Sequence, residues 1–171
     1  MPADATVVVI GVGNSLRGDD SAGLEVAARL CGEPRINVRM SEGEGIDLLA
    51  MLEGADAALL VDAVRSGATP GTIHRYDVSD EPLPSSPRRP AGHAIGTAAA
   101  IELARRLGRL PAKVVVFGVE GERFETGSAR SPAVQAAIEP LVAAVRRESR
   151  RLLATVAAAE PECGDRSRGF G

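Results

Sequence analysis

The feature that most constrains the fold of this chain is the glycine-rich segment GVGNSLRGDDSAG at residues 11–23. It follows an uninterrupted β-type run, TVVVI, at residues 6–10, and it leads into an amphipathic stretch at residues 21–31. This order predicts a strand, a tight loop and a helix. In an open α/β sheet such a loop lies at the carboxyl end of its strand, where ligands bind. The segment therefore predicts both a fold class and the position of a functional site.

The rest of the chain continues the alternation of strand-like and helix-like segments. The apolar run AALLV at residues 57–61 is typical of a strand buried on both faces. Ser131 and Pro132 suit the start of a last helix, in which Pro140 should produce a kink or a break. The alternation predicts an α/β three-layer sandwich, with a mainly parallel twisted sheet and helices on both faces. Further strands are expected at residues 36–40, 72–78 and 113–119, and further helices at residues 46–52 and 94–107.

Length and composition limit the possible functions. With 171 residues, we expect a single domain over residues 1–155 and a disordered tail over residues 156–171. Aromatic residues make up only 2%, Trp is absent and the net charge is -3, which disfavours a nucleic-acid partner. No signal peptide or membrane-length apolar segment is recognisable, so we expect a cytoplasmic protein without membrane contacts. Cys31 and Cys163 are too far apart to suggest a disulfide framework or a zinc cluster, and Cys31 is expected to pack on the first helix.

The two adjacent carboxylates of the glycine-rich loop argue against a phosphate site. The dinucleotide fingerprint G-x-G-x-x-G requires a third glycine at the position that Leu16 occupies here. Asp19 and Asp20 would also repel a phosphate at the start of the helix. One aspartate suffices to cap a helix, so the second needs another explanation. A Rossmann-type nucleotide-binding module remains an alternative interpretation.

Asp20, Asp62 and His93 occupy comparable junctions. Asp20 follows the first strand, Asp62 ends the run LLVD directly after the third strand, and His93 begins a helix after a polar loop. Because the carboxyl ends of parallel strands meet at one edge, the two carboxylates can face one crevice, with His93 above it. Such a set suits a borderline divalent ion such as Ni²⁺ or Zn²⁺ and leaves coordination positions open. Taken singly, Asp62 is as well explained as a turn cap and His93 as an ordinary helix residue, and His74 is expected on a strand surface.

Five segments of the chain form a longer pattern. In order, they are GVGNSLRGDD, EGIDLLAMLEGADAALLVDAV, PGTIHRYD, GHAIG and FGVEGERFETGSARSPAV. Together they resemble the hydrogenase maturation endopeptidases, which process the large subunit of [NiFe] hydrogenases, and the resemblance runs from about Val7 to Val145. The chain departs from the family pattern at Gly121, where Pro usually follows the glutamate, and in the loop SSPRRPAG before His93.

The resemblance implies an endopeptidase that removes a C-terminal extension from the large-subunit precursor, its partner, once nickel has entered the precursor. By motif position, Asp20, Asp62 and His93 are then the metal-contacting and catalytic residues. Two carboxylates and one histidine bind nickel less tightly than thiolates do. We therefore expect the precursor to present the nickel, with only weak binding by the free enzyme. Although the family is sometimes classed with the aspartic-type peptidases, the chain lacks their D-T-G motif.

The residues also limit the mechanism. The chain has neither a G-x-S-x-G elbow nor a cysteine nucleophile with a placed base. A carboxylate beside a divalent cation has a depressed pKa and is a weak base. We therefore expect water activated or positioned by the metal, with Asp20 or Asp62 as general base the alternative. A nickel-recognising maturation chaperone without peptidase activity is a further alternative.

Overall fold

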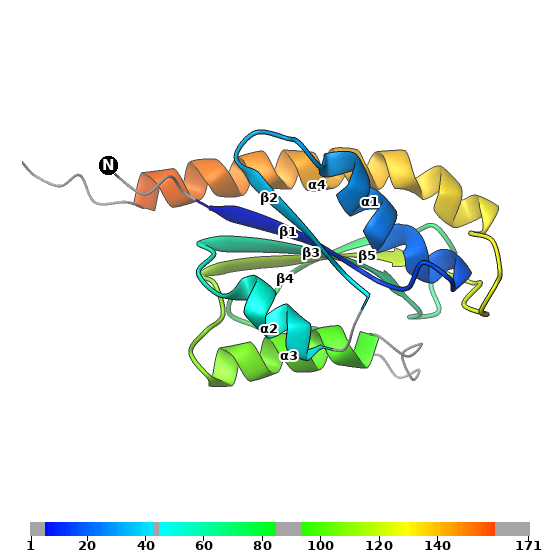
Figure 1. The fold of residues 1–171 in the computed structure, drawn as a ribbon, viewed down its shortest axis with the longest axis horizontal. Helices are drawn as coiled ribbons and strands as arrows, with labels where there is room; N and C mark the ends of the chain where they lie inside the picture. Colours follow the sequence, from blue (N-terminus) through cyan, green and yellow to red (C-terminus); the bar gives the residue numbers. More distant parts are fainter. Residues whose placement is uncertain (1–5, 43–44, 85–93, 160–171) are drawn as a thin grey trace, which may run out of the picture.

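The computed structural model describes residues 6–42, 45–84 and 94–159, so most of the expected tail lies outside it. Within these residues, strands and helices alternate in the order that the sequence predicts (Figure 1). The strands are β1 (Val7–Val12), β2 (Ile36–Ser41), β3 (Ala57–Val64), β4 (Ile73–Asp77) and β5 (Lys113–Glu120). The helices are α1 (Ala22–Leu30), α2 (Ile46–Leu52), α3 (Ala94–Arg106) and α4 (Pro132–Ala159), and a 3₁₀ turn, η1 (Gly18–Ser21), precedes α1.

In the described part of the chain, five strands form one sheet in the order β2-β1-β3-β5-β4. The strands β2, β1, β3 and β5 are parallel to one another, and the edge strand β4 is antiparallel to β5. The central strands β1 and β3 are apolar along nearly their whole length, as burial on both faces requires. Because β1 and β3 are parallel neighbours, their carboxyl ends lie at the same edge of the sheet.

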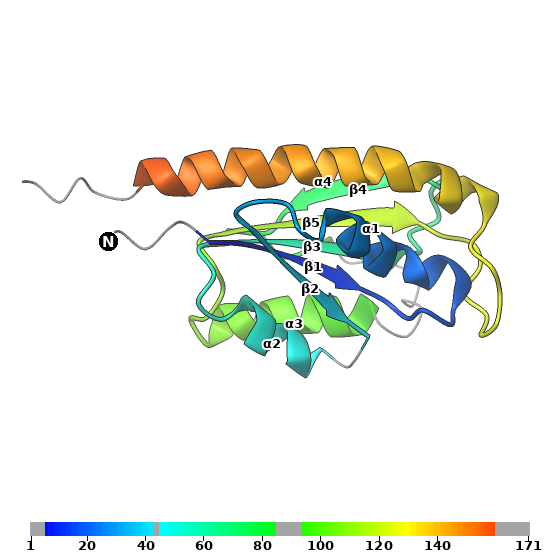
Figure 2. The same cartoon turned by 45° about the horizontal axis from the view of Figure 1, so that its top comes forward.

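Helices cover both faces of this sheet (Figure 2). On one face, α1 and α4 pack against a set of strand residues that includes Val9 and Leu59. On the other face, α2 and α3 pack against the alternate residues, including Ile10 and Leu60. Because successive side chains of a strand point to opposite faces, each central strand contributes to both cores. The structure is therefore the mainly parallel three-layer α/β sandwich that the sequence predicts.

Two glycines determine how closely α1 approaches the sheet. A Cβ atom at Gly11 would lie 2.3 Å from the carbonyl oxygen of Gly23, and a Cβ atom at Gly23 would lie 2.2 Å from that of Val61. Both distances are far shorter than a van der Waals contact, so a side chain at either position would push the helix away. The close packing holds the start of α1, and with it η1, against the carboxyl ends of β1 and β3.

Two local predictions are wrong, and the prediction for Pro140 is confirmed in part. The strand β3 stays paired with β5 as far as Val64, so Asp62 lies inside the strand rather than after it. The helix α4 continues through the exposed Pro140 without a break, but its first turns incline to the rest, which agrees with the predicted kink (Figures 1 and 2). Cys31 lies just beyond the end of α1 and is exposed. None of the helices in the described ranges is both long and apolar enough to cross a bilayer.

Candidate active site

Asp62 is a buried carboxylate near the carboxyl end of β3, with only 3% of its surface exposed. Its Oδ1 accepts a hydrogen bond of 2.8 Å from the backbone N–H of Ala63, and its Oδ2 accepts one of 3.1 Å from the hydroxyl of Thr97. Burial, followed by the charge of Asp20, raises the pKa of Asp62 to about 8, although the two hydrogen bonds oppose this shift. The site therefore holds a proton at neutral pH in the absence of a cation.

Asp20 lies in η1, at the end of the loop that follows β1, and is 1% exposed. The guanidinium Nη1 of Arg17 lies 3.8 Å from its Oδ2. The effect of Asp20 on the pKa of Asp62 means that the two carboxylates are close enough to repel each other. The structure thus brings these two predicted site residues together at the carboxyl edge of the sheet.

The third predicted residue, His93, lies outside the described residues. Helix α3 begins at the next position, and Thr97 in its first turns donates to Asp62, so this end of α3 adjoins the carboxylate pair. Among residues 6–42, 45–84 and 94–159, no three metal-ligating side chains converge on one point. The contribution of His93 to a metal site therefore stays a prediction.

Asp19 has a different environment from its neighbour Asp20. It is completely buried, and its carboxylate accepts hydrogen bonds from the backbone N–H groups of Glu122, Arg123 and Ser131. The hydroxyl of Ser131 donates a fourth bond. The two adjacent aspartates therefore have different roles. Asp20 lies at the site, and Asp19 accepts hydrogen bonds from the segment between β5 and α4.

The family motif near the end of β5 contains another buried acid, Glu120. Its carboxylate accepts hydrogen bonds from the backbone N–H groups of Ser66 and Gly67 and from the hydroxyl of Ser66. The Nε2 atom of His74 lies 3.4 Å from Glu120 Oε2, and the side chain of His74 is only 19% exposed. The prediction that His74 is a surface residue is therefore wrong, because this acid draws its ring inward. These contacts give Glu120 a structural task in holding the turn after β3.

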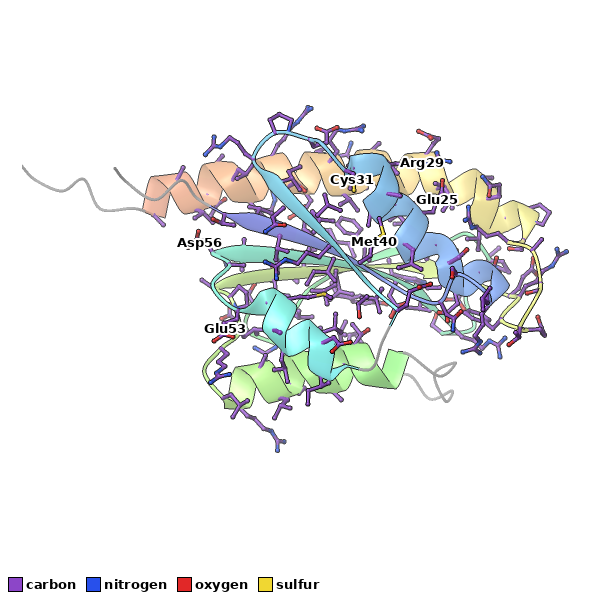
Figure 3. The ribbon with its side chains drawn as sticks, viewed as in Figure 1. Glu25, Arg29, Cys31, Met40, Glu53 and Asp56 are labelled. Carbon is purple, nitrogen blue, oxygen red and sulfur yellow. The ribbon has the colours of Figure 1, made fainter. Side chains whose placement is uncertain are left out.

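An open groove lies beside α1 and the end of β2. Its volume is about 560 Å³, and its wall includes Ser21, the residue that follows Asp20. Glu25 on α1 and Met40 near the end of β2 also line it, and Arg29 lies beside Glu25 on the same helix (Figure 3). Neither Asp20 nor Asp62 lines this groove. Its remaining lining residues are Ser15, Leu24, Ala28, Glu42 and Arg130.

Known proteins are similar to this chain in sequence and in fold. A family model described as hydrogenase maturation protease matches residues 33–148. The hydrogenase expression/formation protein HupD of Rhodobacter capsulatus is 32% identical over 149 residues, which cover 84% of this chain and 71% of HupD. The hydrogenase 2 maturation protease of Escherichia coli K12 is 31% identical over 154 residues, which cover 84% of this chain and 92% of that protease. The solved structure of the hydrogenase maturating endopeptidase HybD from E. coli has a TM-score of 0.73 at 27% identity, covering 85% of this chain and 93% of HybD.

The fold and these likenesses define a peptide hydrolase built on a parallel α/β sandwich. The chain belongs to the hydrogenase maturation protease family, whose model matches well over half of it. This membership confirms the resemblance seen in the sequence and favours a peptidase over the Rossmann-type nucleotide-binding alternative.

Proposed function

We propose that this protein removes the C-terminal extension of a [NiFe] hydrogenase large-subunit precursor after nickel has been inserted into that precursor. Family membership supports a protease of hydrogenase maturation. The single structural observation that carries the proposal is the pair of buried carboxylates, Asp20 and Asp62, at the carboxyl edge of the sheet. Such an edge is where α/β folds bind their ligands.

The donor set fits a nickel ion delivered by the substrate. The charge of Asp20 raises the pKa of Asp62, so the two carboxylates repel each other when both are ionised, and a divalent cation would offset this repulsion. We propose that His93, which directly precedes α3, supplies an imidazole as the third ligand. Three ligands from this chain leave coordination positions for groups of the precursor. The metal is thus part of the substrate, and cleavage depends on metal loading.

The residues of this chain then position the scissile peptide rather than attack it. Asp62 would lose its proton on binding nickel, and a carboxylate beside a cation is a weak base. A Lewis-acidic nickel ion can supply activated water. The water oxygen adds to the peptide carbonyl carbon, the C–N bond breaks, and the proton from water passes to the departing amine.

Intact-mass analysis of a large-subunit precursor from the same host tests the proposal. The precursor is incubated with this protein in nickel-loaded and nickel-free forms. Loss of a C-terminal peptide from the nickel-loaded form alone is the expected result. Cleavage of both forms contradicts the dependence on nickel. Binding of the loaded precursor without cleavage contradicts the peptidase activity and favours a nickel-recognising chaperone.

A further inference from the structure

Asp19 and the segment between β5 and α4 take no part in the chemistry proposed above, although both belong to the family motifs. The segment, residues 121–131, is called the β5–α4 connection below. Asp19 Oδ2 accepts the N–H groups of Glu122 at 2.8 Å and Arg123 at 2.9 Å. The N–H of Ser131 donates to Asp19 Oδ1 at 2.7 Å and its hydroxyl to Oδ2 at 3.0 Å. One carboxylate therefore holds both ends of this connection.

Further hydrogen bonds join the same connection to the loop before η1. The N–H of Gly127 donates to the carbonyl oxygen of Leu16 at 2.7 Å. The Nε of Arg17 donates to the carbonyl oxygen of Phe124 at 3.0 Å. In both views the two segments lie side by side at the same end of the molecule (Figures 1 and 2). The loop that carries Asp20 and the β5–α4 connection are thus one hydrogen-bonded unit.

Two glycines allow this close approach. Gly18 has a φ of +50°, and a Cβ atom there would lie 2.4 Å from the hydroxyl oxygen of Ser128. A Cβ atom at Gly121 would lie 3.0 Å from the Cβ of Asp19 and 2.6 Å from the Cζ of Phe124. Gly121 is the position at which the family usually has Pro, and here the absence of a side chain lets Asp19 and Phe124 pack against the backbone. Asp19, rather than a proline ring, restrains the connection.

Two backbone hydrogen bonds of Asp20 stay within this loop. Its N–H donates to the carbonyl oxygen of Arg17 at 3.0 Å, and its carbonyl oxygen accepts the N–H of Asn14 at 3.1 Å. Both partners lie within six residues of Asp20, so these bonds move with the loop. The neighbouring Asp19 is anchored instead to a segment more than 100 residues away, as separations of 103 to 112 residues show. Any shift of Asp19 therefore shifts Asp20.

We propose that Asp19 is a positioning residue, which sets the location of Asp20 relative to Asp62 by fixing η1 to the β5–α4 connection. The role rests on the proposed cleavage reaction. The Asp19→Asn variant keeps the shape of the side chain, but it replaces one acceptor oxygen by an NH₂ donor that faces other donors. Asp77→Asn is the matched control. Asp77 also accepts an N–H and a hydroxyl, both from Ser79, and it lies at the opposite end of the sheet.

The cleavage test measures kcat and KM on the nickel-loaded precursor. For Asp19→Asn, we expect kcat to fall by about tenfold or more while KM changes less, and Asp77→Asn to cleave like the wild type. A second control, Leu152→Ala, removes a buried side chain of α4 from the core that α1 and α4 form with the sheet. All variants are compared at temperatures equally far below their own Tm. A kcat loss in Asp19→Asn no larger than in Leu152→Ala overturns the proposal, since it reflects lost stability alone.

Amide hydrogen exchange gives a readout that needs no substrate. The amides of Asp19 and Gly127 donate to Arg123 and Leu16 and so join the loop to the β5–α4 connection. In Asp19→Asn, these two amides should exchange about tenfold faster or more, while that of Leu48 in α2 stays unchanged. Unchanged exchange at Asp19 and Gly127 overturns the proposal. If the wild type does not cleave the precursor, the proposed function is lost, and these exchange rates still decide whether Asp19 holds Asp20 in place.

Discussion

The hydroxyl of Thr97 donates a hydrogen bond of 3.1 Å to Oδ2 of Asp62, which joins the first turns of α3 to the end of β3. Thr97 is 3% exposed, so the bond is shielded from water. With the N–H of Ala63 on Oδ1, both oxygens of Asp62 have a fixed donor. The orientation of this carboxylate is therefore determined by two different elements of the fold.

Removing the hydroxyl of Thr97 should weaken cleavage without unfolding the protein. Thr97→Val keeps the shape of the side chain but loses the donor, and we expect kcat on the nickel-loaded precursor to fall by about tenfold. The pKa of Asp62 should rise further, because this hydrogen bond opposes the effect of burial. Thr97→Ser restores the hydroxyl and should recover most of the activity. Equal activity in Thr97→Val and the wild type contradicts the orienting role.

The raised pKa of Asp62 predicts a pH-dependent stability. Burial, with the charge of Asp20, moves this pKa from 3.8 to about 8, so between these values the folded chain retains a proton that the unfolded chain has lost. The contribution of Asp62 to the free energy of unfolding should therefore decrease as the pH rises through this window. Asp62→Asn cannot ionise and should lose this dependence.

Chemical denaturation of both proteins between pH 5 and pH 9 measures this effect. We expect the stability of Asp62→Asn relative to the wild type to increase steadily up to about pH 8 and then to level off. Asp77→Asn controls for the loss of an ordinary hydrogen-bonded carboxylate. A difference between Asp62→Asn and the wild type that is constant with pH contradicts the raised pKa.

Because α1 lies so close to the sheet, adding a single methyl group at Gly23 should destabilise the protein. Gly23→Ala places a Cβ atom 2.2 Å from the carbonyl oxygen of Val61, and we expect the free energy of unfolding to fall by about 1–3 kcal/mol. The exposed position Ala28 of the same helix provides the control, since Ala28→Ser should change stability by less than about 0.5 kcal/mol. Urea denaturation compares the two, and equal stabilities contradict the predicted clash.

The ion pairs of Glu148 should stabilise the folded protein at neutral pH, and protonation of Glu148 in acid should remove this stabilisation. Burial raises the pKa of Glu148, but hydrogen bonds from Arg75 and Arg151 outweigh this effect and lower it overall. Glu148→Gln should therefore be less stable than the wild type at neutral pH, by about 1 kcal/mol. The difference should shrink as the pH falls through the lowered pKa of Glu148. Thermal unfolding at pH 7 and pH 3 checks this, and a difference that grows in acid contradicts it.

The sequence sufficed to predict the sheet, the layers and the approach of Asp20 to Asp62. The alternation of strand-like and helix-like segments predicts parallel strands, and neighbouring parallel strands end at one edge, where Asp20 and Asp62 can meet. The only indication of Thr97 in the sequence is that it is the one hydroxyl residue in the otherwise apolar run GTAAAI. Its bond to Asp62 could not be derived, because it depends on how α3 rotates against the sheet.

The roles of Asp19 and Glu120 could not be predicted for a related reason. Their hydrogen-bond partners lie 53 to 112 residues away, and no local pattern specifies which loops meet. The adjacent aspartates look alike in the sequence, and only tertiary packing separates the one at the site from the one that anchors the loop. The partial burial of His74 could not be predicted for the same reason, since a strand pattern does not reveal a buried acid beside it.

The most direct test of the central claim compares single-turnover cleavage of nickel-loaded precursor by four proteins, with the released peptide measured by mass spectrometry. They are the wild type, Asp20→Asn, Asp62→Asn and the remote control Asp77→Asn. The account predicts rapid release by the wild type and by Asp77→Asn, and a loss of at least about a hundredfold in rate for both site variants. Release at the wild-type rate by either folded site variant would show that the carboxylate pair is not the active site.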